Sequence, residues 1–328
     1  MAGGKKFLDM SKKIAGNTLE QVKANTQKAS EKVTEATSNA KTGLISAKDK
    51  VTHGVVSAID ENGNGEIDIE DIIIKSFKTP GIKVDRAAFL QKEFFKHMPQ
   101  EQIGTAITFT PAIAGVPKEL IDQLADDTIN FERNFVSGIS AALGVPGGIG
   151  MAATVPADVL QYYGYMLRAA QKLLYLYGFP QLYVDENGSL DTETLNTLIL
   201  CLGVMYGAAG ANNVIKVVAR ALAKGVSKKI MKAALTKGVV YPILKSFMKW
   251  FSVNLTKKIL ANAAEKAIPV VGAAIGGGLT FFTFKPCCVK LKKALNDTFL
   301  SNSEHIPSEE EDALYKDVVE TYVDEETT

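Results

Sequence analysis

The sequence predicts an all-α protein: a multi-helix domain with glycine-rich buried helices, preceded by a long helical arm and a helix–loop–helix unit. Three observations support this fold class. Residues 12–59 contain no proline. Alternation with a period of two, which would indicate strands, is confined to short segments such as 182–184. Residues 118–136 place apolar side chains at helical spacing, namely Leu120, Ile121, Leu124, Ile129 and Phe131.

The first segment, residues 12–59, is predicted to form one long helix. Small and apolar side chains recur there every eleven residues, among them Val22, Val33, Leu44 and Val55. Eleven residues complete three turns at about 3.67 residues per turn, so these positions form a nearly straight stripe. Such a helix can lie on a lipid surface, pack in a right-handed coiled coil, or dock on the main domain as a solvated arm. We assign residues 1–47 to this basic amphipathic arm.

Residues 60–71, DENGNGEIDIED, carry oxygen-bearing side chains at alternate positions. A calcium loop needs such ligands, a glycine where the chain turns sharply, and a carboxylate that closes the shell. Gly65 stands at position six, and Ile67 supplies an apolar residue at position eight. The predicted metal ligands are Asp60, Asn62, Asn64, Glu66 (through its backbone carbonyl), Asp68 and Asp71.

This loop and its flanks, roughly residues 48–78, resemble the EF-hand family. The resemblance implies a bound Ca²⁺ between two helices. Asp71 stands where the family has glutamate, and its shorter side chain should weaken Ca²⁺ binding or favour Mg²⁺. The alternative is a polar turn that binds no metal. A second segment, 185–189, begins similarly but has Leu190 where the turn glycine belongs, so it predicts only a loop.

The net charge of +1 conceals a strong segregation of charge along the chain. Residues 1–59 carry ten lysines and five acids, and residues 60–215 carry ten bases and nineteen acids. Residues 216–293, the basic block, carry sixteen bases and one acid, for a net charge of +15. The acidic tail, 301–328, lies within residues 294–328, which carry one base and eleven acids, for a net charge of −10. This pattern predicts an anionic partner for the basic block, either a membrane surface or the acidic parts of the protein itself.

We expect the tail to fold back over the basic block and to compete there with anionic lipid. Its segment 309–312 should be solvated because it is wholly acidic. The basic block itself pairs lysines with apolar residues at helical spacing and includes Trp250 and Phe251, which is typical of a membrane-surface helix. Packed helices with water-facing lysines are the alternative. Nucleic acid is the least favoured partner because neither zinc-ligand spacing nor interleaved aromatic residues are present.

Three stretches contain no charged residue: 134–157, 194–215 and 267–284. Each approaches the length that spans a bilayer, but prolines 146 and 156 interrupt the first and Asn212 and Asn213 the second. We therefore predict buried helices or an insertable hairpin, and Ala267–Phe284 is the candidate for insertion. Three cysteines, two of them adjacent, and an N-terminus without an apolar signal region predict a cytoplasmic protein, peripherally associated with a membrane.

Residues 135–284 resemble the EcsC family of helical bacterial proteins, within a domain that we place at 79–300. The matching residues are Gly144–Gly148, Pro156–Asp158, Leu167–Arg168, Leu176–Phe179 and Ile268–Ala273. The family implies an all-α domain and supplies no catalytic residues. First named from an operon encoding an ABC transporter, it also suggests a structural accessory of a transporter.

Asp158 is the only charged residue between Arg133 and Arg168, which makes it a candidate functional carboxylate near Tyr162 and Tyr163. The alternatives are a helix N-cap after Pro156 or a buried pair with Arg168. No Walker loop, nucleophile elbow or dinucleotide fingerprint is present, and the three histidines are scattered. The sequence thus predicts a non-enzymatic calcium-binding protein at a membrane surface or in a membrane complex. The alternative is an enzyme acting on a lipid or amphipathic substrate around Asp158.

Overall fold

The computed structural model describes residues 56–61, 63–143, 151–185, 189–226, 240–265, 272–302 and 304–326. The chain divides into two units, Met1–His53 and Gly54–Thr328, and the described residues all lie in the second. The predicted arm at 1–47 therefore falls outside the described residues. So does the start of the predicted helix–loop–helix, whose first described residues, 56–59, are helical.

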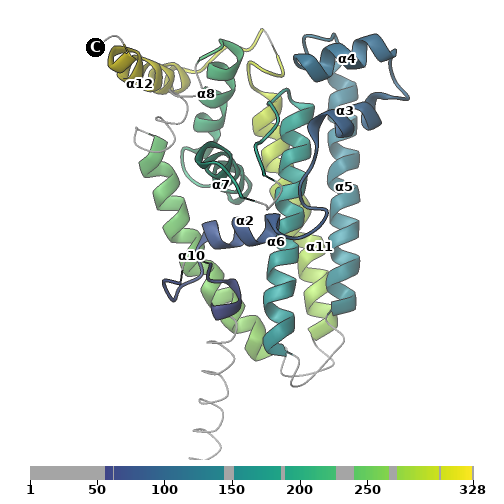
Figure 1. The fold of residues 1–328 in the computed structure, drawn as a ribbon, viewed down its shortest axis with the longest axis vertical. Coiled ribbons are helices and arrows are strands. Elements are labelled where there is room, and N and C mark those ends of the chain that lie inside the picture. Colours follow the sequence, from purple (N-terminus) through teal and green to yellow (C-terminus); the bar gives the residue numbers. More distant parts are fainter. Residues whose placement is uncertain are drawn as a thin grey trace, which may run out of the picture. The chain divides into compact units, whose positions relative to one another are not determined.

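The regular elements of the described residues are helices, which confirms the all-α fold class (Figure 1). The ambiguous segment 182–184 contributes one isolated antiparallel bridge, between Val184 and Leu190. The helices in chain order are α2 (Ile69–Phe77), α3 (Arg86–Phe94), α4 (Gln100–Thr108), α5 (Lys118–Leu143), α6 (Met151–Leu176), α7 (Thr192–Tyr206), α8 (Ala211–Ala223), α10 (Val240–Glu265), α11 (Gly272–Asn296) and α12 (Glu309–Glu326).

Helices α5, α6 and α11 pack against one another and lie side by side in Figure 1. On the described part of α11 the fully buried residues recur at intervals of three and four, which places them on one face. They are Phe284, Cys288, Leu291 and Leu295. The stripe predicted on α5 is confirmed at Ile121, Leu124 and Ile129. It is wrong at Phe131, whose side chain is exposed.

The apolar sequence at 69–77 predicts a helix that stops at Thr79–Gly81, and α2 confirms it: the helix ends at Phe77, and Gly81 follows with a positive φ of 85°. It packs across α6, and Ile69, Ile72 and Ile73 are fully buried. Residues 84–104 predict one helical unit from sequence, but the structure has two helices there, α3 and α4, because the chain turns at residues 95–99.

Arg86, the first residue of α3, ties these short helices to the long ones. Its guanidinium donates hydrogen bonds to backbone carbonyls at the end of α4 and just after α6. The carbonyl acceptors belong to Ala106, Ile107, Phe109 and Phe179. A single buried cation therefore occupies carbonyls that α4 leaves unbonded at its C-terminus.

The second charge-free stretch forms two helices that break at glycines rather than at asparagines. In the second stretch α7 ends at Gly207 and α8 begins after Gly210, both with positive φ (75° and 80°). The predicted break at Asn212 and Asn213 is wrong, because both lie inside α8. Asparagine is only mildly unfavourable in a helix, whereas glycine adopts left-handed backbone without steric cost.

The first stretch falls in α5 and α6 with residues 144–150 between them, and most of the third falls in α11, which continues past Lys285. Residues 267–271 lie outside the described residues. Among the helices of the described part of the chain, none is both long enough and apolar enough to cross a bilayer.

The acidic tail forms α12, which packs on the basic helix α8 (Figure 1). Arg220 of α8 pairs with Asp312 and lies over the Tyr315 ring, with 4.1 Å between the guanidinium carbon and the ring centroid. The predicted contact between the tail and the basic block is thereby confirmed at this helix. The predicted solvation of 309–312 is wrong for Glu311, whose residue surface is 0% exposed.

Candidate functional site

The loop at 60–71 is a tight turn built around Asp60 and two glycines. One carboxylate oxygen of Asp60 accepts a hydrogen bond from the Gly63 amide at 2.7 Å, and the other accepts from the Gly65 amide at 2.8 Å. Gly63 and Gly65 have φ values of 74° and 83°, a left-handed backbone that strongly favours glycine. The spacing of the two glycines thus allows the chain to fold around the first carboxylate.

Asp68 connects the loop to α10. Its Oδ2 accepts a hydrogen bond from the Asn64 amide group at 2.7 Å, and its Oδ1 accepts one from the Ser252 hydroxyl at 3.2 Å. Ser252 lies on α10, 184 residues further along the chain. Any change at Asp68 therefore reaches a helix of the basic block directly.

Asp71 is 1% exposed and bonded to the backbone. Its Oδ1 accepts the amide of Glu61 and its Oδ2 the amide of Asp68, each at 3.0 Å. The bond to Asp68 caps the start of α2, and the bond to Glu61 closes the loop. The residue predicted to close a metal shell thus holds the two ends of the loop together in this structure.

Apolar side chains fix the loop against the helices. Ile67 is buried, as its position in the motif predicts, together with Ile59 before the loop and Ile69 after it. The Glu61 side chain points to the flanking helix and pairs with Lys75 and Lys78. The hydrogen bond from Lys78 is the main cause that lowers the Glu61 pKa. The loop residues 60–71 contain no lysine or arginine, so the predicted donor set is oxygen only.

The predicted ligands gather on one loop, but their carboxylates do not converge. Within the described residues no group of three or more His, Cys, Asp or Glu side chains is placed to hold a metal ion. Asn62 falls outside those residues, and Asn64 and Asp68 bond to each other. Each oxygen of Asp60 accepts one backbone hydrogen bond, and a carboxylate oxygen has a second lone pair that can face a cation. The chemistry of the donors fits a hard divalent ion.

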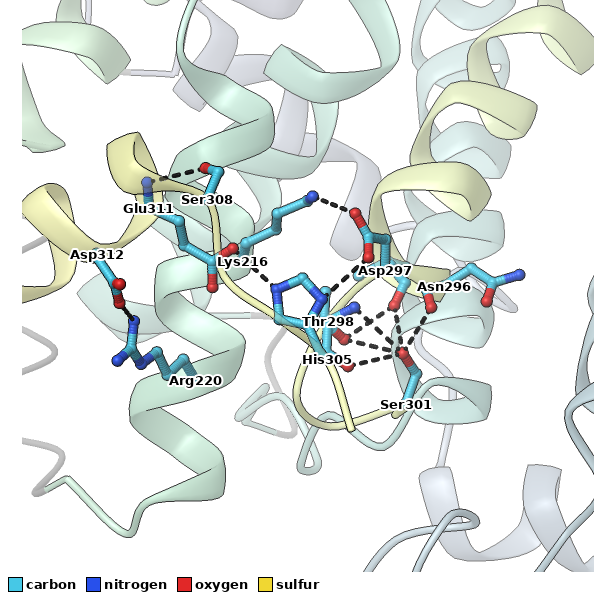
Figure 2. A network of polar contacts seen from close by, with 11 residues as sticks. Lys216, Arg220, Asn296, Asp297, Thr298, Ser301, His305, Ser308, Glu311 and Asp312 are labelled. Carbon is cyan, nitrogen blue, oxygen red and sulfur yellow. Dashed lines mark hydrogen bonds and ion pairs between the residues drawn. The ribbon is translucent and has the colours of Figure 1, made fainter. Parts of the chain in front are cut away.

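A second polar site, which sequence reasoning missed, surrounds His305. Figure 2 shows its ring between two carboxylates. Nδ1 lies 3.0 Å from Asp297 Oδ1, and Nε2 lies 2.9 Å from Glu311 Oε2. Because ionised carboxylates only accept, both contacts are hydrogen bonds when both ring nitrogens carry protons. The other Glu311 oxygen, Oε1, has no hydrogen-bond partner.

This site anchors the acidic helix. Asp297 also pairs with Lys216 of α8, and the hydrogen bond from that lysine is the main cause that lowers the Asp297 pKa. Ser308 accepts a hydrogen bond from the Glu311 amide at 3.2 Å. The spacing Ser308-x-x-Glu311 is a helix-start signal that could have located the beginning of α12. It could not have indicated the histidine that the glutamate meets.

Asp158 lies inside α6, which begins at Met151, so the predicted N-cap role is wrong. Its side chain is outside the described residues. The predicted partner, Arg168, lies on the same helix ten residues away, about 15 Å along the axis, and bonds to Glu132 instead. The neighbouring phenols are buried, which raises the pKa of Tyr163 to about 12 and that of Tyr162 above its usual range.

The aromatic pair of the basic block divides between surface and core. Trp250 is 49% exposed, whereas Phe251 is buried against Tyr163 and Tyr206. The lysines beside them, Lys245 and Lys249, are exposed. Of the predicted interfacial pair, Trp250 is therefore accessible and Phe251 is not.

No protein-family model matches this chain, and no curated protein or solved structure matches it. The comparisons therefore do not bear on the resemblances to the EF-hand and EcsC families, and functional inference here rests on the residues themselves.

Proposed function

We propose that this chain is a non-enzymatic, divalent-cation-binding helical protein whose cation site is the loop at 60–71. The observation that carries the proposal is the turn itself: two left-handed glycines fold the backbone around Asp60, in a loop with only oxygen donors. Asp60, Asn62, Asn64, Asp68 and the Glu66 carbonyl would hold the ion, with Asp71 as a further carboxylate. The bound cation, Ca²⁺ or Mg²⁺, would neutralise the clustered carboxylates.

The contact between Asp68 and Ser252 supports a responsive role rather than a purely structural one. Asp68 would be both a ligand and the acceptor for a hydroxyl on α10. A cation coordinated by Asp68 would therefore alter the contact between the loop and α10. That contact is at Ser252, two residues from Trp250. Trp250 is the only tryptophan in the chain, so its emission reports on this helix.

Titration calorimetry should show one site for Ca²⁺ in the wild-type protein, with modest affinity because Asp71 is a short closing residue. The Asp60→Ala variant should lose this heat. Asp185→Ala is the matched control, because Asp185 also accepts a backbone amide in an exposed loop that is predicted to bind no metal. Equal heats for wild type and Asp60→Ala, or no heat at millimolar Ca²⁺, would rule out the site.

The Ser252→Ala variant separates binding from response. It should keep the heat of cation binding, because the hydroxyl is not a predicted ligand. It should lose the cation-dependent change in Trp250 emission. If that change persists unaltered in Ser252→Ala, the loop does not act on α10 through this bond.

A second candidate function, attachment to an anionic membrane surface, is favoured by the contact of α12 with α8. Two cations, Arg220 of α8 and Lys224 just after it, face the acidic helix. Lys224 also lies over Tyr315, at 5.1 Å from the ring centroid, beside Arg220 at 4.1 Å. Lys216 pairs with Asp297 just before the tail. An anionic surface would compete with α12 for these same groups, each worth about 1 kcal/mol near such a surface.

Removing residues 304–328 should therefore raise affinity for phosphatidylglycerol vesicles, most strongly at low salt. A less drastic variant, Glu310→Gln with Asp312→Asn, removes the carboxylates that contact Asn213 and Arg220 and should give a smaller gain. Glu309→Gln controls for net charge, because Glu309 is exposed on the same helix. Vesicle co-sedimentation measures the binding of the wild type, the truncation, the double variant and Glu309→Gln. If neither the truncation nor the double variant binds better than wild type, the tail does not compete with lipid.

An enzyme acting around Asp158 and a structural accessory of a transporter, for which the resemblance to the EcsC family is the warrant, remain predictions of the sequence. No contact among the described residues favours either over the two candidates above.

A further inference from the structure

A cavity of about 600 Å³ opens between the end of α7 and the start of α10. This volume lies within the range of small-molecule sites, which are mostly apolar with a few placed polar groups. The lining residues come from α7, the turn after it, and α10. They are Tyr206, Gly207, Ala208, Ala209, Pro242, Ile243, Ser246, Phe247 and Trp250.

Three aromatic rings form one wall of the cavity. Phe247 and Trp250 stack with centroids 6.0 Å apart and planes inclined by 27°. Tyr206 lies 6.1 Å from Trp250. Its hydroxyl donates to the Tyr163 hydroxyl at 3.2 Å, so that polar end is already satisfied inside the protein. Burial raises the Tyr206 pKa well above its usual value, so this phenol stays neutral. The wall therefore offers flat apolar surface and a half-exposed indole.

The opposite side is kept open by small residues on the α7–α8 turn. Gly210 has a positive φ, and a Cβ there would stand only 3.1 Å from Ile243 Cδ1. Glycine at this position thus lets the turn approach α10 closely. Ala208 and Ala209 then present single methyl groups to the cavity rather than filling it.

One cation, Lys290 of α11, lies beside Gly207 of this cavity, although it is not itself a lining residue. A Cβ on Gly207, which lines it, would stand 3.4 Å from the Lys290 Nζ. Lys290 is exposed on α11, and none of the ion pairs of the described residues includes its ammonium. An apolar aromatic wall beside an unpaired cation suits a ligand with an apolar body and one anionic end.

We propose that this cavity binds a small amphipathic anion, namely an alkyl chain that ends in a carboxylate. The chain lies against Tyr206, Phe247 and Trp250, and the carboxylate faces Lys290. This site and the cation loop share no residue, although both contact α10.

The experiment follows Trp250 emission during titration of the full-length protein with decanoate, with 1-decanol as the uncharged chain of the same length. Wild type should show a saturable change with decanoate and weaker binding of decanol. Lys290→Gln should lower the affinity for decanoate about fivefold, the upper value for one exposed ion pair. The affinity for decanoate should then equal that for decanol. Lys293→Gln, an exposed lysine one turn along α11, should leave decanoate affinity unchanged.

Ser246→Phe tests the cavity itself, because it adds bulk at a lining position without adding a second tryptophan. It should abolish the saturable change while circular dichroism and thermal melting stay close to wild type. If this variant misfolds, the two lysine variants still decide the matter. The proposal is overturned by an absent or non-saturable signal in wild type, by equal affinities for decanoate and decanol, or by equal losses in Lys290→Gln and Lys293→Gln. It is also overturned if phosphatidylglycerol vesicles alone, and not free decanoate, change the emission.

Discussion

Replacing Arg86 with methionine should lower the free energy of unfolding by about 3–5 kcal/mol. Arg86 is 7% exposed, and its guanidinium donates to four backbone carbonyls, those of Ala106, Ile107, Phe109 and Phe179. Burial lowers the Arg86 pKa from its usual value, which indicates that the environment is poorly solvating. Methionine fills similar volume but donates no hydrogen bond, so buried carbonyls would be left unsatisfied.

Urea unfolding followed by circular dichroism measures this effect. Lys92→Met is the matched control, because it removes a cation from the same helix at a side chain that is 81% exposed. It should change stability by less than about 0.5 kcal/mol. Arg86→Lys keeps the charge but has fewer hydrogen-bond donors, so its free energy of unfolding should lie between those of Arg86→Met and Lys92→Met. If Arg86→Met is no less stable than Lys92→Met, the hydrogen bonds from Arg86 to these carbonyls do not contribute to stability.

Replacing Glu132 with alanine should lower the free energy of unfolding by a similar amount, about 3–5 kcal/mol. The Glu132 carboxylate on α5 is fully buried. It accepts a hydrogen bond from Lys172 Nζ at 2.6 Å and lies 3.3 Å from Arg168 Nε, and both cations belong to α6. Those two cations are themselves mostly buried. Removing the carboxylate would leave two positive charges facing each other between packed helices.

The same denaturation experiment separates this buried pair from a surface one. Asp126→Ala removes an α5 carboxylate that pairs with Lys292, but its side chain is 55% exposed, so the loss should stay below about 1 kcal/mol. The triple variant Glu132→Leu, Arg168→Met and Lys172→Met should recover much of the stability, because no charge is then left unpaired. A triple variant as unstable as Glu132→Ala would mean that packing, not charge, accounts for the loss.

Local sequence patterns were sufficient for most of the helical architecture and for the shape of the candidate loop. The α2 helix at 69–77 and the connection before Lys118 follow from apolar periodicity and from prolines and glycines, which act within a few residues. Gly65 and the buried Ile67 of the loop were likewise predicted from their positions in the motif, whereas the turn at Gly63 was not. The predicted break at Asn212 and Asn213 is wrong, because Gly207 and Gly210 supply the left-handed backbone at which α7 ends and α8 begins.

The roles of individual polar groups were decided only by tertiary structure. Ser252 meets Asp68 across 184 residues, and Glu311 is buried because the chain after α11 returns to present His305 to it. In sequence, Glu311 is one of four consecutive acids, and its spacing from Ser308 marks a helix start but does not indicate that it is buried against His305. Burial and partnership depend on which side chains distant segments bring into contact. By itself, therefore, the sequence determined where helices form and which loop can turn around a carboxylate. The packing of the helices determined which carboxylates are buried, which cations they meet, and where a cavity stays open.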